Sequence, residues 1–245
     1  MISEVTPVRD IATALPEAAR IFARAGIDCS CSTVESLRDA CSAAGADVGE
    51  VLRQIQALTE EAQPAPARDW SSETARQVVS QILEVHHAHL KEELPRLEQL
   101  MNRVYEKHGK TYAEILKVHE IFFTLKDELE MHLRKEEVML FPYVLRLEDA
   151  QVQGLPFPPC PFGTVANPVR VMIREHDSAE EAMQAIRTNT ADYTPPANAC
   201  LGFTLLLQGL QALEEDLRVH IRLENEVLFP KAVGLEQSCH SSPAA

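Results

Sequence analysis

Apolar positions recur at alternating steps of four and three residues over four long stretches of the chain. This spacing places them on one face of an α-helix and predicts amphipathic helices, each with a continuous apolar stripe. The connections at 109–111 and 190–197 are short, whereas the proline-rich one at 154–163 is longer and cannot be helical. Two short links around one longer crossing favour an antiparallel, up-down four-helix bundle. The four stripes cover residues 83–108, 115–140, 169–183 and 206–228.

Shorter helical patterns precede these stripes. Pro16 is suited to open a helix that stops at Gly26, and two further patterns cover 36–41 and 48–58. From Glu61 to Asp69, Pro and Ala replace any apolar period, which predicts an extended linker. We therefore predict an all-α fold made of a helical module at 1–60, a linker at 61–69, the bundle at 70–235 and a flexible tail at 236–245.

Composition narrows the functional classes. The 245 residues are 45% apolar and 24% charged, and nine Gly with few aromatic residues argue against a β-sandwich. A formal charge of −14 repels phosphate backbones, so we expect no nucleic-acid partner. The apolar runs are too short to span a membrane and the start resembles no signal peptide, so we expect no membrane partner, a cytoplasmic location and reduced cysteines.

An internal repeat relates the two halves of the predicted bundle. The eleven residues from His132 to Pro142 align without gaps to those from His220 to Pro230, 88 residues later. A shift of 89 residues lays His87 on His176. Each half therefore has one histidine on its first helix and one His-x-x-x-Glu motif on its second, as expected for two helical hairpins related by a pseudo-two-fold axis.

These repeated residues point to a metal site. A lone histidine on an apolar stripe is usually a core residue, and one His-x-x-x-Glu is usually a surface pair. Here, however, all six side chains replace apolar residues on core-facing stripes, where an unpaired carboxylate costs several kcal/mol. Residues four apart lie about 6 Å apart on one helix face and can reach one cluster. We predict a metal centre formed by His87, His132, Glu136, His176, His220 and Glu224.

The donor set narrows the choice of metal. Imidazole and carboxylate without thiolate suit iron, manganese or zinc. If Glu136 and Glu224 each bridge two ions and each ion takes two histidines, an oxo or hydroxo bridge leaves one open position per ion, which is typical of a reactive site. A ferritin-type site requires Glu-x-x-His on two helices, and Glu84-x-x-His87 is the one match in the sequence.

Further motifs accompany the ligand pattern. They are Phe22-x-x-x-Gly26-Ile27-Asp28, His87 before Glu93-Leu94-Pro95, His108-Gly109, His132-x-x-Lys135-Glu136-Glu137, Leu140-Phe141-Pro142, Glu175-His176-Asp177 and His220-x-x-x-Glu224-Asn225 with Leu228-Phe229-Pro230. In these motifs the chain resembles a known family, the hemerythrin-like di-iron proteins of the Repair of Iron Centres (YtfE/ScdA) group. This resemblance implies a cytoplasmic protein with two non-haem iron ions. It also implies a role in recovering damaged iron–sulfur clusters under nitrosative and oxidative stress, with nitric oxide bound or reduced at the iron.

Three accessory residues follow from the same comparison. The family usually carries Cys-Cys-Gly-Gly in its N-terminal module, whereas this chain reads Cys29-Ser30-Cys31-Ser32, so Cys31 holds the second position and Cys29 is a substitute for the first. His108 shares a stripe with His87, but 21 helical residues span about 31 Å, which is too far for both to reach one cluster unless the helix breaks near Pro95 and folds back. We therefore expect His108 outside the metal ligands, at a helix end or a second, weaker metal position.

Other polar residues near the motifs receive secondary roles. We expect His86 and His89 to be solvated or to lie behind the ligands, and Glu137 and Asp177 to accept hydrogen bonds from ligand imidazoles. The acidic runs Glu60-Glu61, Glu92-Glu93 and Glu214-Glu215-Asp216 are expected to be solvated helix faces.

The expected function is a stress-response di-iron protein that binds or reduces nitric oxide, or binds dioxygen species, and supports iron–sulfur cluster repair. Iron–sulfur proteins or a cluster scaffold are the macromolecular partners that this function implies. Two alternatives stay open: an oxygen or nitric oxide carrier or sensor without turnover, and a redox-responsive adaptor that docks a partner through residues 1–60. The sequence leaves open whether the protein is an enzyme, and its oligomeric state.

Overall fold

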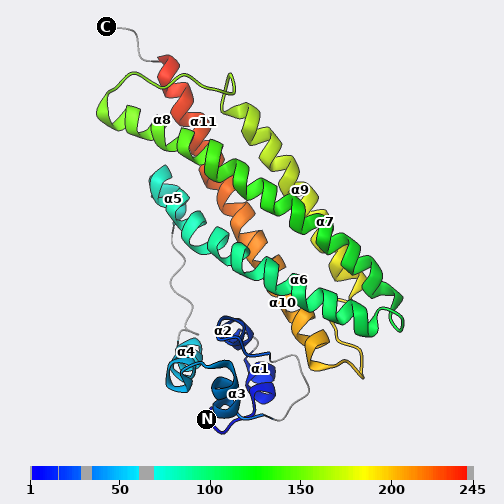
Figure 1. The fold of residues 1–245 in the computed structure, drawn as a ribbon. Helices are drawn as coiled ribbons and strands as arrows, with labels where there is room; N and C mark the ends of the chain where they lie inside the picture. The colour runs from blue at the N-terminus through cyan, green and yellow to red at the C-terminus, as the bar shows by residue number, and fades with distance from the viewer. Residues whose placement is uncertain (1, 16, 29–34, 61–68, 242–245) are drawn as a thin grey trace. The chain divides into compact units, whose positions relative to one another are not determined.

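The computed structural model describes residues 2–15, 17–28, 35–60 and 69–241. Short helices come first, and the described part of the chain is helical apart from turns, loops and an isolated bridge between Pro7 and Ser36, which confirms the all-α prediction (Figure 1). Cys29, Cys31 and most of the expected linker lie outside the described residues. The short helices are α1 (Val8–Ala14), α2 (Ala18–Arg24), α3 (Leu37–Ala44) and α4 (Val48–Glu60).

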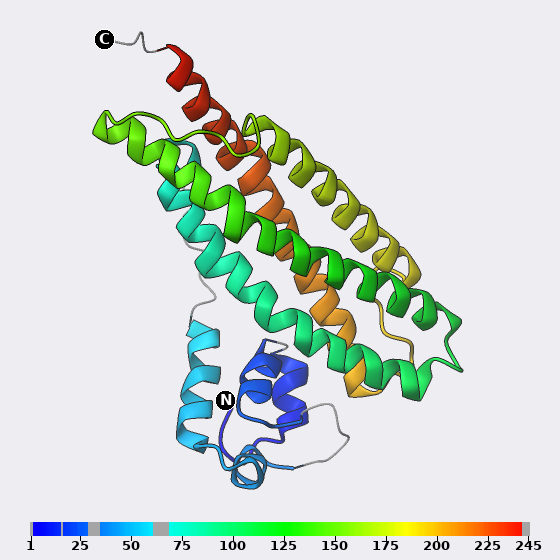
Figure 2. The same cartoon turned by 45° about the horizontal axis from the view of Figure 1, so that its top comes forward.

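Longer helices follow and pack as the expected bundle. In both views they run side by side, and successive long helices alternate in direction (Figures 1 and 2). No helix in the described ranges is long and apolar enough to cross a membrane. The elements are η1 (Trp70–Ser72), α5 (Ala75–Gln81), η2 (Ile82–His87), α6 (Ala88–His108), α7 (Ala113–Lys135), η3 (Glu136–Leu140), α8 (Phe141–Gln153), α9 (Ala166–Asn189), α10 (Leu201–Leu223), η4 (Glu224–Leu228) and α11 (Phe229–Ser241).

Contacts divide the chain into two compact units, which we call the N-terminal unit and the site unit. All six predicted metal ligands belong to the site unit. The N-terminal unit contains residues 1–67, 93–120 and 187–212, and the site unit contains residues 68–92, 121–186 and 213–245.

The site unit is stabilised by a large apolar core and by capped helix ends. Val78, Ile82, Phe141, Leu147 and Phe229 are among its buried side chains. A capping box of Thr74 and Gln77 begins α5, and Gly154 ends α8 with a left-handed backbone (φ 64°) that favours glycine. These features fix where the ligand-bearing helices start and stop.

Helix α11 continues through residues 236–241, the first part of the segment expected as a tail. Its Glu236 accepts hydrogen bonds from Thr164 Oγ1 (2.5 Å) and from the backbone N–H of Val165 (2.9 Å). These contacts hold the end of the long 154–165 connection directly before α9 begins.

Three short π-helical turns, which the periodicity did not predict, interrupt the long helices. Pro142 and Pro230 follow η3 and η4 by two residues. A proline inside a helix has no N–H for the carbonyl four residues earlier and collides with it, and a widened π-turn removes both conflicts. Such turns are frequent at functional sites, and each of these three begins or ends at a predicted ligand.

The N-terminal unit buries a charged group of its own. Glu93 is fully buried, and its carboxylate accepts hydrogen bonds from Arg96 (Nε at 2.9 Å) and pairs with Arg20 at 3.4 Å. A side chain at Gly209 would reach within 2.7 Å of the Arg96 guanidinium, so glycine there leaves the ion pair its space. The expectation that the Glu92-Glu93 run is a solvated face was therefore wrong for Glu93, because arginines supply the charge that water would otherwise solvate.

Candidate metal centre

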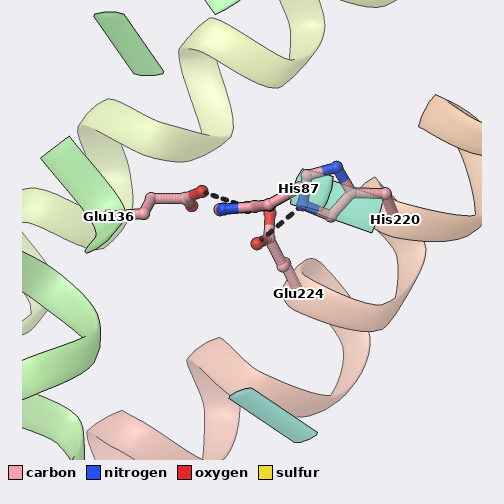
Figure 3. A group of neighbouring side chains, drawn as sticks. All are labelled: His87, Glu136, His220 and Glu224. Carbon is pink, nitrogen blue, oxygen red and sulfur yellow. Dashed lines mark hydrogen bonds and ion pairs between the residues drawn. The ribbon is translucent and has the colours of Figure 1, made fainter. Parts of the chain in front are cut away.

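The six predicted ligands converge from different elements of the site unit, and each is at most 3% exposed. Figure 3 shows four of them, His87, Glu136, His220 and Glu224, with their side chains pointing toward one another. Because η3 and η4 begin at the two glutamates, the π-turns lie directly beside the carboxylates. The ligands are His87 at the end of η2, His132 in α7, Glu136 at the start of η3, His176 in α9, His220 in α10 and Glu224 at the start of η4.

Their donor atoms form two groups that share both glutamates. Within each group the donor atoms all lie within 4.8 Å of one another, as suits a single ion. We call these groups position A and position B. Position A consists of His87, Glu136, His220 and Glu224, and position B consists of His132, Glu136, His176 and Glu224.

The Glu136 carboxylate is divided between the two positions. Its Oε2 lies 3.4 Å from Nε2 of His87 in position A, while its Oε1 lies 3.4 Å from Nε2 of His132 in position B. One oxygen therefore faces each group, which is the arrangement that a bridging carboxylate requires.

Glu224 repeats the same arrangement in the second half of the chain. Its Oε1 is 3.0 Å from Nε2 of His220, and its Oε2 is 3.1 Å from Nε2 of His176. In position B, the Nε2 atoms of His132 and His176 approach to 3.1 Å. Two nitrogens bound at about 2.1 Å to one metal ion at near-right angles lie roughly 3 Å apart, so this spacing fits a shared ion.

Unpartnered buried atoms give an independent test of the fit. Nε2 of His87, both oxygens of Glu136 and Oε2 of Glu224 are buried without a hydrogen-bond partner. A buried polar atom left in this state costs about 1–3 kcal/mol, and more when it is charged. All of these atoms face the interior of the two groups, so a pair of cations would satisfy them together.

The pKa shifts of the candidate ligands also favour a cation at this site. Burial disfavours the charged form of His132, but the nearby Glu136 and Glu224 carboxylates outweigh it and raise the pKa of His132 to about 9. The pKa of His87 is also raised, against burial, by Glu136. Burial opposes the charge on Glu224, yet His220 and His176 hold the pKa of that carboxyl well below its usual range. The cluster thus favours positive charge at its centre.

Acceptors behind the histidines orient three of the four rings. Nδ1 of His87 lies 2.8 Å from Glu137, as expected, and a second partner, Lys91, is 2.6 Å from the same carboxylate. Burial raises the pKa of the Glu137 carboxyl, but hydrogen bonds from Lys91 and His87 outweigh it and lower that pKa. An Nδ1–H donated to such an acceptor leaves the Nε2 lone pair directed inward, toward an ion.

Two further acceptors were missed by the sequence reasoning. Nδ1 of His132 lies 2.9 Å from Glu175, which also pairs with Lys135, and Nδ1 of His176 lies 3.0 Å from Asn225. Asp177, expected in such a role, is exposed. The repeat could have identified Asn225, because the 88-residue shift lays the acceptor Glu137 on it. It gives no such signal for Glu175, whose counterpart by the 89-residue shift is His86.

The acidic run Glu214-Glu215-Asp216 also departs in part from the expected solvated face. Asp216 pairs with His86 at 2.9 Å, and His86 is 5% exposed, behind the ligands rather than in solvent. Glu214 is 7% exposed and pairs with Arg218 at 2.9 Å. Glu214 and Asp216 are therefore withdrawn from solvent, whereas Glu215 between them is exposed, as expected.

His108 is not a member of either group. Its Nε2 is 3.1 Å from Sγ of Cys200 in the N-terminal unit. Helix α6 runs through Pro95 without a break, so it does not fold His108 back toward His87. The roles expected for Cys29 and Cys31 concern residues outside the described ranges.

A cavity of about 610 Å³ adjoins the site. Its lining includes three of the ligand histidines, His132, His176 and His220. Most of the lining surface is apolar, with Leu129 and Leu217 among its side chains, and charged residues contribute to the rest, namely Asp127, Glu128, Lys135, Arg174 and Glu175. An apolar cavity in contact with the ligands suits a small uncharged molecule better than an ion or a sugar.

Comparisons with known proteins agree with this geometry. Residues 78–232 match the family model described as a hemerythrin HHE cation-binding domain, and residues 4–59 match a domain of unknown function, DUF542. The chain is 30% identical over 230 residues, covering 94% of this chain and 97% of each relative, to proteins named iron-sulfur cluster repair protein YtfE from Escherichia coli O157:H7, Escherichia coli O1:K1 and Escherichia fergusonii. This chain belongs to the Repair of Iron Centres family. Its hemerythrin domain carries two adjacent His/Glu groups that suit a di-metal site.

Proposed function

We propose that the protein holds two non-haem iron ions, with an oxo or hydroxo bridge, and uses them in the repair of iron–sulfur clusters during nitrosative or oxidative stress. In this assignment His87 and His220 hold the ion in position A, and His132 and His176 hold the ion in position B. Glu136 and Glu224 bridge the two. The proposal keeps the cytoplasmic location expected from the sequence.

The division of each carboxylate between the two positions carries this proposal. Two oxygens of one glutamate facing two separate histidine pairs serve no purpose in a simple buried ion pair, where one arginine would satisfy both oxygens. Four neutral imidazoles and two carboxylates instead suit a pair of divalent or trivalent first-row ions. Each ion would have two histidines and one oxygen from each glutamate, which leaves a coordination position open for a small ligand.

The relatives' name supports the link to cluster repair, and the apolar cavity supports the choice of small ligand. Nitric oxide and dioxygen are small and uncharged, so they enter an apolar cavity at little desolvation cost. Iron bound in the centre supplies a redox-active Lewis acid. The chain's own residues orient the imidazoles, exclude bulk water through burial and supply the negative charge that the ions require. The partners implied are iron–sulfur proteins or a cluster scaffold.

Metal analysis and Mössbauer spectroscopy of anaerobically purified protein, followed by nitric oxide titration, test this proposal. We expect two iron ions per chain, a spin-coupled pair in the oxidised protein, and an iron-nitrosyl signal in the reduced protein. Reactivation of a damaged iron–sulfur enzyme, measured with the same preparation, separates repair from mere gas binding. A protein that contains two irons and binds nitric oxide without reactivating the enzyme would be a carrier or sensor instead.

A further inference from the structure

The four ligand histidines are not equally supported. Three of them place Nδ1 within 3.0 Å of an acceptor, namely Glu137, Glu175 or Asn225. Nδ1 of His220 is buried and has no hydrogen-bond partner. When Nε2 faces the centre of the site, a neutral imidazole carries its proton on Nδ1, so His220 buries an N–H without an acceptor.

The internal repeat explains why His220 lacks the acceptor that His132 has. Glu175 immediately precedes His176 and accepts from His132, and by the 89-residue shift its counterpart is His86, which immediately precedes His87. The ring of His86 stacks on that of His220, parallel to within 1° and with centroids 5.3 Å apart. Its own Nδ1 is directed to Asp216. A stacked imidazole presents its face, not a lone pair, so it does not replace the carboxylate of the other half.

We propose that the two metal positions are held unequally, and that the ion in position A leaves the protein before the ion in position B. Position A relies on His87 and His220, of which one ring has an acceptor, whereas both rings of position B have one. This inference rests on the proposed di-iron site. It adds that the identity of residue 86, which is histidine where the repeat-related position 175 has glutamate, sets which ion is the more easily released.

The physical reason is the basicity and orientation of the ligand ring. An acceptor at Nδ1 fixes the tautomer and raises the electron density at Nε2, and loss of such a partner typically weakens metal binding about 10- to 100-fold. We therefore expect release from position A to be about 10-fold faster than release from position B, or more. For a protein that supplies iron, this difference would make one ion available while the other keeps the site assembled.

Release of iron to a ferrous chelator tests the inference. The full-length protein is loaded with iron(II) under anaerobic conditions, mixed with excess chelator, and followed by the absorbance of the iron complex. We expect two phases of equal amplitude that together account for two irons per chain. A total near two supports the proposed site, and a total of one or none overturns that site rather than the inequality.

Variants of His86 and Glu175, which the 89-residue shift relates, assign each phase of iron release to one metal position. His86→Glu and His86→Gln each supply an acceptor of the kind that Glu175 and Asn225 provide, and we expect them to slow the fast phase about 10-fold toward the slow one. Gln avoids placing a second carboxylate beside Asp216, so it tests the same point if the Glu variant does not fold. Glu175→Ala makes the opposite change, and we expect it to accelerate the slow phase toward the fast one.

His86→Leu is the matched control, because it removes the stacked ring without supplying an acceptor. We expect it to leave the fast phase at least as fast as in the unaltered protein. Release of both irons in a single phase from the unaltered protein would overturn the inequality. A fast phase that is unchanged in both acceptor variants, or equally slowed in His86→Leu, would overturn the role assigned to His86.

Discussion

Both units of the protein bury glutamates, and they compensate the charge in different ways. In the N-terminal unit, the buried carboxylate of Glu93 is satisfied by the arginines Arg96 and Arg20. In the site unit, Glu136 is equally buried, but histidines face its two oxygens in place of arginines, and both oxygens lack hydrogen bonds. A carboxylate with its own arginine is a structural ion pair, whereas one that faces several imidazoles suits a metal ion.

We expect the largest effect on the site unit from removing the two carboxylates that positions A and B share. Replacing both Glu136 and Glu224 by alanine removes the oxygens shared by the two positions, so we expect iron to fall from two per chain to nearly none. Glu93→Gln is the matched control, because it alters a buried glutamate of the other unit and is expected to keep both irons. Full iron loading of the double variant, measured by metal analysis, would contradict the assignment.

Removing Glu93 tests whether the buried ion pair of the N-terminal unit stabilises the protein. Glu93→Ala leaves the guanidinium of Arg96, which is 13% exposed at the side chain, without its partner. Breaking a buried ion pair on one side typically costs about 3–5 kcal/mol, so we expect a loss of that size in the free energy of unfolding. Denaturant unfolding measures it. Glu50→Ala, which breaks an exposed pair with Arg53, should change little. An equally small change in Glu93→Ala would show that the buried pair is not stabilising.

The sequence predicted much of this arrangement and missed identifiable parts of it. Stripe periodicity located the long helices, and the repeat located all six residues that the structure brings together, because helical spacing and duplication are visible in one dimension. Burial of Glu93 was missed since its partner Arg20 comes from a distant segment. The π-turns were missed because each adds a single residue to one helical turn, beside a ligand. A change of one residue is too local to alter the apolar periodicity of a long helix.

The two kinds of buried carboxylate should also respond differently to pH. In the metal-free protein the pKa of His132, raised to about 9 chiefly by Glu136, lies above the roughly 6.5 of an unfolded imidazole. The folded state therefore binds this proton more tightly. The resulting stabilisation is complete below about pH 6.5 and is lost as the pH rises through about 9. Arginine stays charged throughout this range, so the Glu93 pair contributes no such dependence.

Thermal unfolding of the metal-free protein between pH 6.5 and 9.5 measures this effect. We expect the midpoint to fall as the pH rises, and Glu136→Gln to flatten the decline because it removes the main charge that raises the pKa. The metal-loaded protein should behave in the opposite way, since metal binding requires deprotonated imidazoles and is weakened by acid. A metal-free protein whose midpoint rises over the same range would exclude a protonated His132 as a stabilising group.

The smallest effect is expected for His108, which the sequence placed either at a helix end or at a second, weaker metal position. It lies in the N-terminal unit beside Cys200 and in ring contact with Phe203, 5.6 Å between centroids, and Lys107 and partial burial lower its pKa. A largely neutral ring in such a setting acts as a packing and hydrogen-bonding residue. We expect His108→Ala to keep two irons per chain and to cost about 1 kcal/mol of stability, as ordinary substitutions do. Loss of one iron per chain would mean that the N-terminal unit also supplies a metal ligand, and the contrast between the two units would then fail at this residue.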